Sequence, residues 1–138
     1  MKLLIDTNIV LDVLCNRKSF IENSSKVFKL CETKKLDGYL SAISVPNIAY
    51  ILRKELSIEK LKSIILKLNI IFSIIELKPN DLILATDLDF KDYEDALQSV
   101  CAKRIKADFI ITRNTKDFKN SPVKAITPEQ LFDRIKNQ

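Results

Sequence analysis

Short apolar runs alternate along the chain with longer segments in which apolar positions recur at the helical period. The runs are three or four residues long and mostly apolar at successive positions, which is typical of strands buried on both faces of a sheet. We therefore expect five strands, at Lys2–Ile5, Tyr39–Ser41, Phe72–Ile75, Phe109–Ile111 and Val123–Ile126.

The segments between these runs have helical signals. Ser44 is expected to cap a helix that begins at Val45-Pro46, and Pro79 is expected to open a second helix. The run Thr127-Pro128-Glu129-Gln130 combines a threonine cap, a proline at the first position and the glutamine of a capping box. A further helix has its apolar positions on one face, at Ile58, Leu61, Ile64, Ile65 and Leu68.

Strands that alternate with helices, in a chain without hairpin signals, predict a parallel sheet with helices on both faces. The expected fold class is a three-layer α/β/α sandwich around a central, mainly parallel sheet of about five strands. The chain has 138 residues and contains no repeats or Gly/Ser-rich linkers, so we expect a single domain over residues 1–138.

Two residue types are almost or entirely missing from the chain. It contains no histidine, which excludes a Ser-His-Asp triad, a Cys-His pair and an imidazole-ligated zinc. It contains one glycine, Gly38, which excludes a Walker phosphate loop and a GxGxxG dinucleotide fingerprint. Any chemistry must therefore come from carboxylates, hydroxyls, amides, lysine, arginine or a bound metal.

The cysteines and the hydropathy pattern bear on the compartment. Cys15, Cys31 and Cys101 are odd in number and form no CxxC motif, so we interpret them as small core residues in a reducing environment. The N-terminal apolar run is stopped at Asp6, too early for a signal peptide. Charged and polar residues interrupt the most apolar stretch, 64–77, so no membrane span is expected. These observations predict a cytoplasmic protein.

The chain is basic, with 23 Lys and Arg against 18 Asp and Glu and a formal net charge of +5. This balance favours an anionic partner, above all a nucleic acid, although a solvated lysine-rich surface gives the same count. Arg113, Lys116 and Lys119 flank Asp117 in the sequence and are our candidates for contacts with such a strand.

Acidic residues follow two of the predicted strands and begin one helix. Asp6 comes directly after the first strand, and Asp117 follows the fourth. Asp92 and Asp95 are three residues apart at the start of a helix, which makes them neighbours on its surface. Ligand crevices in parallel sheets lie beyond the carboxyl ends of the strands, so these carboxylates are expected to converge. Taken singly, each also has a simpler role, as a helix cap, a partner of the helix dipole or a loop residue.

A group of carboxylates at one sheet edge requires a counter-charge. Each close pair repels by roughly 4 kcal/mol at an effective dielectric constant of 20. A hard divalent cation, Mg²⁺ or Mn²⁺, relieves that repulsion because it prefers carboxylate and water oxygens. Such an ion activates water and neutralises charge on a phosphoryl group without any histidine.

Three segments together resemble the PIN-domain family, which includes the VapC-type toxins. They are residues 4–12 (LIDTNIVLD), 94–98 (EDALQ) and 109–118 (FIITRNTKDF). The resemblance runs in order over nearly the whole chain. It implies a parallel sheet flanked by helices, Mg²⁺- or Mn²⁺-dependent ribonuclease activity on RNA, a homodimer and a cognate antitoxin that blocks the cleft.

The resemblance also implies roles for individual residues. Asp6, Asp95 and Asp117 match acidic positions of the family and are expected to be the catalytic residues that bind the metal, with Asp92 assisting. The family usually has acidic residues at two further positions, where this chain has Asn47 and Asn114. An amide offers a carbonyl oxygen to a metal but no negative charge. The auxiliary set that orients carboxylates or water is then expected to be Asn47, Asn114, Thr7, Asn8 and Thr112.

Two other functions remain open from the sequence. The two asparagines are compatible with a catalytically weak PIN domain that binds RNA or a protein partner. Asp6 after the first strand is also compatible with an aspartyl-phosphate enzyme or receiver domain. However, haloacid-dehalogenase-like phosphatases have Asp-x-Asp at this point, and this chain has Asp6-Thr7-Asn8. Metal-dependent RNA cleavage is therefore the leading hypothesis.

Overall fold

The structure is a computed structural model in which residues 1–137 are described. In this range five strands alternate with helices. In chain order the elements are β1 (Lys2–Ile5), α1 (Thr7–Leu14), α2 (Ile21–Glu32), β2 (Asp37–Ser41), α3 (Ser44–Leu52), α4 (Ile58–Ile71), β3 (Ser73–Ile75), α5 (Pro79–Thr86), α6 (Tyr93–Arg104), β4 (Phe109–Ile111), the 3₁₀ helix η1 (Thr115–Phe118), β5 (Ala125–Ile126) and α7 (Pro128–Lys136).

The strands form one sheet in the order β3-β2-β1-β4-β5, and every neighbouring pair is parallel. The chain first winds outward from β1 to β3 and then returns to add β4 on the other side of β1. The strand order therefore reverses between β1 and β4. In open α/β sheets the ligand crevice lies outside the carboxyl ends of the strands at this reversal.

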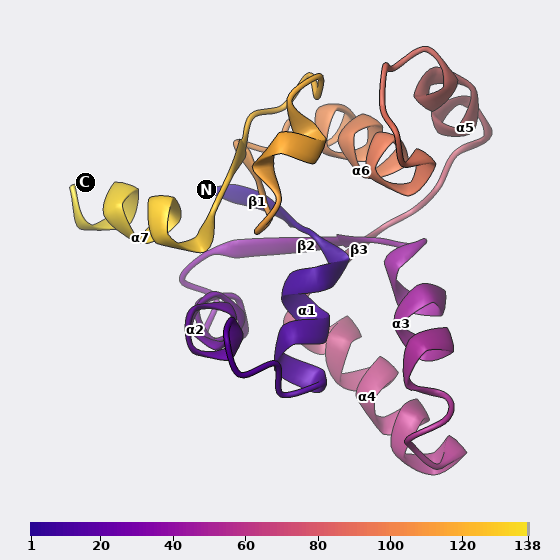
Figure 1. Cartoon of the computed structure of the whole chain (residues 1–138), viewed down its shortest axis with the longest axis vertical. Coiled ribbons are helices and arrows are strands. Elements are labelled where there is room, and N and C mark those ends of the chain that lie inside the picture. The colour runs from indigo at the N-terminus through magenta and orange to yellow at the C-terminus, as the bar shows by residue number, and fades with distance from the viewer. Residues whose placement is uncertain (138) are drawn as a thin grey trace.

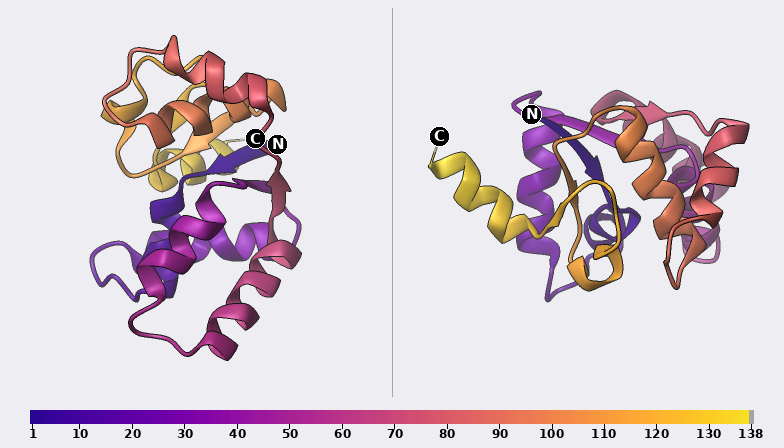
Figure 2. Two further views of the ribbon diagram at one scale, coloured as in Figure 1. Left: turned by 90° about the vertical axis from the view of Figure 1, so that its right-hand side faces the viewer. Right: turned by 90° about the horizontal axis from the view of Figure 1, so that it is seen from above.

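Helices cover both faces of the sheet, as Figures 1 and 2 show. Leu3 and Ile5 of β1 belong to the main core, which also contains buried side chains of α1, α2, α3, α4 and α7. Leu4, between them, points to the opposite face, where it shares a core with Cys101 of α6. This alternation follows from the two-residue period of a strand. The expected three-layer α/β/α fold is confirmed, and its sheet is entirely parallel.

The predicted elements are present, with shifts at their ends. α3 begins at Ser44 rather than after it, and Ile43 occupies the cap position. The prediction of a Ser44 cap is therefore wrong: its hydroxyl is buried and bonds Thr7 at 2.7 Å. Phe72 ends α4, where its amide donates to the Leu68 carbonyl, so β3 begins one residue later than expected. The helix opened by Pro79 and the capping box at Thr127 are confirmed.

Gly38 lies where β2 passes closest to α2 and to the end of α4. A Cβ atom at this position would lie 2.5 Å from the Cys31 Sγ atom and 3.0 Å from Cδ1 of Phe72. Only glycine fits between these buried side chains without displacing them. Cys31 and Cys101 are buried as expected, whereas Cys15 is half-buried, and all three thiols are free. No helix within residues 1–137 is long and apolar enough to cross a membrane.

Candidate functional site

Asp6 lies at the carboxyl end of β1, at the reversal of the strand order. It precedes α1 as the cap residue. Its carboxylate accepts hydrogen bonds from the Thr112 hydroxyl at 2.8 Å and from Nε2 of Gln98 at 3.2 Å. Burial raises the pKa of Asp6, although both hydrogen bonds lower it. The site thus contains a carboxylate that is largely removed from water.

Further acidic residues face the same cavity, which has a volume of about 320 Å³. We call it the acidic cavity. It is lined by residues that come from β1 and α1, from α3, from the start of α6 and from η1: Asp6, Thr7, Asn8, Leu11, Asn47, Tyr50, Ile51, Asp92, Glu94, Asp95 and Asp117. The structure therefore brings together the four aspartates that the sequence singled out.

The carboxyl group of Asp95, at the start of α6, also has a raised pKa. Burial, which is the largest cause, and the negative charges of Asp6, Asp92, Asp117 and Glu94 together raise its pKa to about 7. Asp92 is the cap residue of α6, and its carboxylate accepts a hydrogen bond from the Asp95 amide at 3.2 Å. Asp92 therefore has a local structural role as well as a place at the cavity. Carboxylates this closely coupled favour either a bound proton or a bound cation.

A second cavity, of about 740 Å³, adjoins the first and shares three of its aspartates. We call it the lysine cavity. It is lined by the loop before α6, the start of α6 and η1, through Asp89, Phe90, Lys91, Asp92, Asp95, Lys116, Asp117, Lys119 and Asn120. Lys116 and Lys119, two of the predicted RNA contacts, thus lie beside the carboxylates. An anionic chain held by these lysines would pass next to the acidic cavity.

The donor set of the acidic cavity fits a hydrated divalent ion. Within residues 1–137 no three acidic or cysteine side chains are close enough to enclose a metal ion by themselves. Mg²⁺ typically keeps several waters and takes only one or two protein carboxylates, so it does not require such a cage. Burial raises the pKa of both Asp6 and Asp95, and neighbouring carboxylates also raise that of Asp95, so a cation bound here would favour the charged forms. Oxygen donors in this arrangement suit Mg²⁺ or Mn²⁺.

The predicted auxiliary residues divide into two groups. Thr7, Asn8 and Asn47 line the acidic cavity, and Thr112 contacts Asp6 from the end of β4. Asn114 lines neither of the two cavities and is exposed. Its contribution is made by its backbone amide, which donates to the Thr112 hydroxyl at 3.1 Å. The expectation that the Asn114 side chain assists a metal is therefore not supported by its position.

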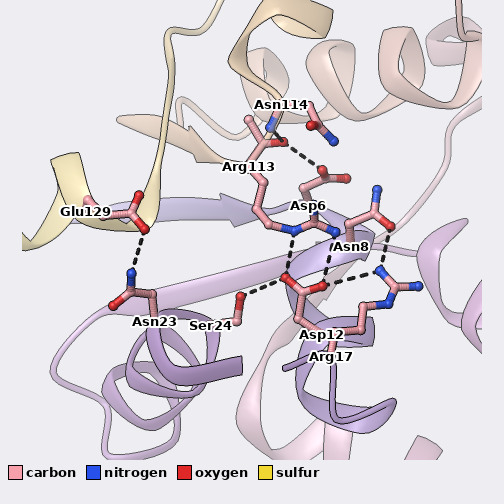
Figure 3. Close-up of polar contacts among 10 residues, drawn as sticks. Asp6, Asn8, Asp12, Arg17, Asn23, Ser24, Arg113, Asn114 and Glu129 are labelled. Atoms are coloured by element: carbon pink, nitrogen blue, oxygen red, sulfur yellow. Dashed lines mark hydrogen bonds and ion pairs between the residues drawn. The ribbon is translucent and has the colours of Figure 1, made fainter. Parts of the chain in front are cut away.

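Arg113 is also placed differently from the expectation. Its side chain points toward Asp12 of α1, as Figure 3 shows. Its guanidinium donates to both carboxylate oxygens of Asp12, with Nε at 2.8 Å and Nη2 at 3.1 Å. Arg113 therefore has a buried partner on α1 that was not visible from the local sequence.

Four further residues around the cavity are not predicted from the sequence. Glu94 lines it and accepts a hydrogen bond from the Thr7 hydroxyl at 3.1 Å. Gln98 is fully buried against Asp6, and its Oε1 has no hydrogen-bond partner within residues 1–137. Tyr50 and Ile51 are exposed apolar side chains at the rim. Helical spacing was the available signal, since Gln98 follows Asp95 by three residues and Tyr50 follows Asn47 by three.

The fold and the cavity together define a parallel α/β protein with a carboxylate-rich site at the reversal of its strand order. Comparison with protein families is consistent with this description. The PIN domain profile matches residues 2–116, and the chain therefore belongs to the PIN-domain family.

Individual relatives support the family assignment. The chain is 26% identical over 137 residues to Ribonuclease VapC1 of Aquifex aeolicus, a match that covers 96% of this chain and 94% of the relative. The structure is similar to a toxin-antitoxin complex from Klebsiella pneumoniae, with a TM-score of 0.70, 23% identity and coverage of 91% and 97% of the two chains. It is also similar to VapBC2 of Rickettsia felis bound to a promoter DNA fragment, with a TM-score of 0.69, 20% identity and coverage of 92% and 98%.

Proposed function

We propose that this protein is a VapC-type endoribonuclease that uses a divalent metal to hydrolyse RNA phosphodiester bonds. The observation that carries the proposal is the convergence of Asp6, Asp95 and Asp117 on one cavity, where mutual repulsion and burial hold the pKa of Asp95 at about 7. Membership of the PIN-domain family and the similarity to a VapC ribonuclease support the same activity. Divalent-metal dependence is general to VapC-type PIN ribonucleases.

In this proposal Asp6, Asp95 and Asp117 would hold a hydrated ion, one or two of them directly and the rest through its bound waters. Asp92 and Asn47 would supply further oxygen atoms to those waters. The ion is Mg²⁺ or Mn²⁺ because the cavity offers oxygen donors and neither histidine nor cysteine. When bound, it lowers the pKa of a coordinated water and neutralises charge on the phosphoryl group. The protein contributes oriented ligands: Thr112 and Gln98 fix the two oxygens of Asp6 through the hydrogen bonds described above.

The proposed path of the RNA follows the lysine cavity into the acidic cavity. Lys116 and Lys119, joined by Lys91, would neutralise the phosphates on either side of the scissile bond. The carboxylates of the acidic cavity would repel the phosphates of the bound strand unless a cation lies between them. This arrangement couples RNA binding near the site to metal binding, as expected for a nuclease whose overall charge is +5.

We further propose that the protein acts in the cytoplasm as the toxin of a pair, with a cognate antitoxin, and forms a homodimer. The toxin-antitoxin complexes among its structural neighbours support a protein partner for this chain. Tyr50 and Ile51 are exposed at the rim of the acidic cavity, with 64% and 46% of their surfaces accessible. An apolar rim of this kind offers a partner protein a contact surface from which it can block the cavity.

The experiment that tests the ribonuclease proposal is cleavage of a structured RNA by the purified protein in Mg²⁺ and then in Mn²⁺. Parallel reactions contain EDTA, the Asp6→Asn variant, and a control Asp133→Asn variant that removes an exposed carboxylate of α7. We expect metal-dependent cleavage by the wild type and the control and none by Asp6→Asn. Binding of RNA in EDTA without cleavage in either metal would instead support a PIN domain that acts as a binding module.

A further inference from the structure

Asp12 is a fully buried carboxylate that belongs to neither cavity. It lies on α1, six residues after Asp6, and accepts hydrogen bonds from three side chains on different segments of the chain (Figure 3). Ser24 of α2 donates at 2.9 Å, Arg17 at 3.3 Å, and Arg113 donates twice, at 2.8 and 3.1 Å. Each carboxylate oxygen therefore has two donors, and the charge is balanced by two guanidinium groups.

Arg113 is held on a second side as well. Its guanidinium carbon lies 3.8 Å from the ring centre of Phe20, and its side chain is 19% exposed. A planar guanidinium that is paired at two atoms and stacked on a ring has its orientation fixed, unlike a lysine ammonium. The backbone of Arg113 is therefore fixed relative to α1.

The sequence position of Arg113 gives this pairing its significance. The preceding residue, Thr112, donates to Asp6, and the following residue, Asn114, donates its amide to Thr112. Immediately afterwards η1 begins, and it carries Asp117 to the rim of both cavities. The Arg113 side chain thus joins two parts of the site. One is α1, which directly follows Asp6, and the other is the segment after β4, which carries Asp117.

We propose that Arg113 and Asp12 are positioning residues that set the distance between Asp6 and Asp117 and so determine how tightly the site binds its metal. The proposal rests on the proposed metal-dependent function but concerns residues that contact neither metal nor RNA. It gives Arg113 a role other than the expected contact with RNA. Charge alone is not sufficient for this role, because a lysine at position 113 would keep the charge and lose the paired geometry.

The chain contains a matched control for this pair. Asp81 of α5 is also buried, and Arg104 of α6 donates to both of its oxygens, with Nε at 3.1 Å and Nη2 at 3.0 Å. Arg104 lies at the far end of α6 from Asp95 and lines neither the acidic nor the lysine cavity. A substitution there removes a similar buried ion pair without touching the loop after β4.

The test compares Arg113→Lys with Arg104→Lys in three measurements on the full chain. These are the free energy of unfolding in urea, the dissociation constant for Mn²⁺ in the absence of RNA, and kcat and KM for RNA cleavage. We expect both variants to lose similar stability. Only Arg113→Lys should bind Mn²⁺ at least tenfold more weakly and require correspondingly more Mn²⁺ for half-maximal kcat, with KM for RNA little changed. Equal Mn²⁺ affinity in the two variants, or a raised RNA KM with unchanged Mn²⁺ affinity, would overturn the proposal.

A measurement without metal separates this proposal from the proposed function. The backbone amide resonances of Asp6 and Asp117 should shift in Arg113→Lys and remain in place in Arg104→Lys, whether or not the protein cleaves RNA or binds Mn²⁺. If the wild type shows neither activity, the nuclease proposal fails and these resonances decide the positioning role. If Arg113→Lys does not fold, Asp12→Asn is compared with Asp81→Asn by the same measurements. Unshifted resonances in Asp12→Asn then contradict the proposal.

Discussion

The Thr112 hydroxyl donates a 2.8 Å hydrogen bond to the Asp6 carboxylate, although the two residues are 106 positions apart in the sequence. The contact joins the carboxyl ends of β4 and β1, the two strands between which the strand order reverses. It supplies a donor to a carboxylate whose burial raises its pKa. The hydroxyl of Thr112 therefore helps to keep Asp6 charged.

Replacing this hydroxyl gives a first prediction. Thr112→Val keeps the shape of the side chain but removes a hydrogen bond to a charged group, which typically costs about 1.5–3 kcal/mol. We expect a loss of this size in the free energy of unfolding near neutral pH, measured with urea, and a higher Mn²⁺ concentration for half-maximal activity. Thr112→Ser retains the donor and should behave like the wild type. Equal behaviour of the valine and serine variants would contradict the assigned role.

The raised pKa of Asp95 predicts how stability depends on pH. Burial and the neighbouring carboxylates move this pKa from the ordinary 3.8 to about 7, so the folded state binds the proton more tightly than the unfolded state. The resulting stabilisation is complete below about pH 4 and is lost as the pH rises through about 7. In metal-free protein, the melting temperature of the wild type should therefore fall more over this interval than that of Asp95→Asn.

Divalent metal should suppress this pH dependence, because a bound cation favours the charged carboxylates. Melting curves in saturating Mg²⁺ should show a smaller fall in wild-type stability between about pH 4 and about 7 than those in EDTA. The Asp95→Asn variant should show little difference between the two conditions. A wild-type pH profile that is the same with and without metal would be incompatible with metal binding at Asp95.

Gly38 gives a prediction about the fold rather than the site. In Gly38→Ala the new methyl group would lie 2.5 Å from the Cys31 sulfur, so buried side chains of α2 must move. Overpacking of this kind usually costs about 1–3 kcal/mol, and we expect such a loss in urea unfolding. Adding Cys31→Ala removes the nearest atom and should restore part of the lost stability. A Gly38→Ala variant as stable as the wild type would show that α2 is packed less closely on β2 than described.

The lysine cavity predicts where RNA binds. The double variant Lys116→Ala/Lys119→Ala should bind RNA more weakly, and the dependence of its affinity on salt should be reduced by about 0.7 in logarithmic slope for each lost phosphate contact. The control is Lys60→Ala/Lys62→Ala, which removes the same charge from exposed positions on α4. Fluorescence anisotropy at several salt concentrations measures both. Equal weakening in the two double variants would show that only net charge matters.

Much of the fold could be predicted from the sequence, because a buried parallel strand appears as a short run of apolar residues. Short apolar runs mark all five strands. The rule that ligands bind beyond the carboxyl ends of parallel strands predicts from the sequence alone that Asp6 and Asp117 lie close together. Strand ends were less predictable, since Phe72 satisfies its amide in α4 instead of starting β3. The end of a short strand depends on which neighbour accepts its backbone hydrogen bonds, and that is a tertiary property.

The roles of the charged residues were harder to predict from the sequence, because they too depend on tertiary contacts. Arg113 resembled an RNA contact because it stands among other basic residues, but its partner Asp12 is 101 positions away and completely buried. Asp12 itself lies in an apolar helix, where a carboxylate implies a paired cation that the sequence does not identify. Glu94 was within a recognised motif, and only the fold shows that it faces Thr7.

The most direct test of the central claim is the position of Mn²⁺ in crystals of the protein, located by its anomalous scattering. The claim is that the acidic cavity is a metal site built on Asp6, Asp95 and Asp117. We predict an anomalous peak in that cavity, within coordination distance of Asp6 or Asp95, and its loss in the Asp6→Asn variant crystallised under the same conditions. A peak elsewhere on the molecule, or an acidic cavity without a peak in wild-type crystals at saturating Mn²⁺, would contradict the account.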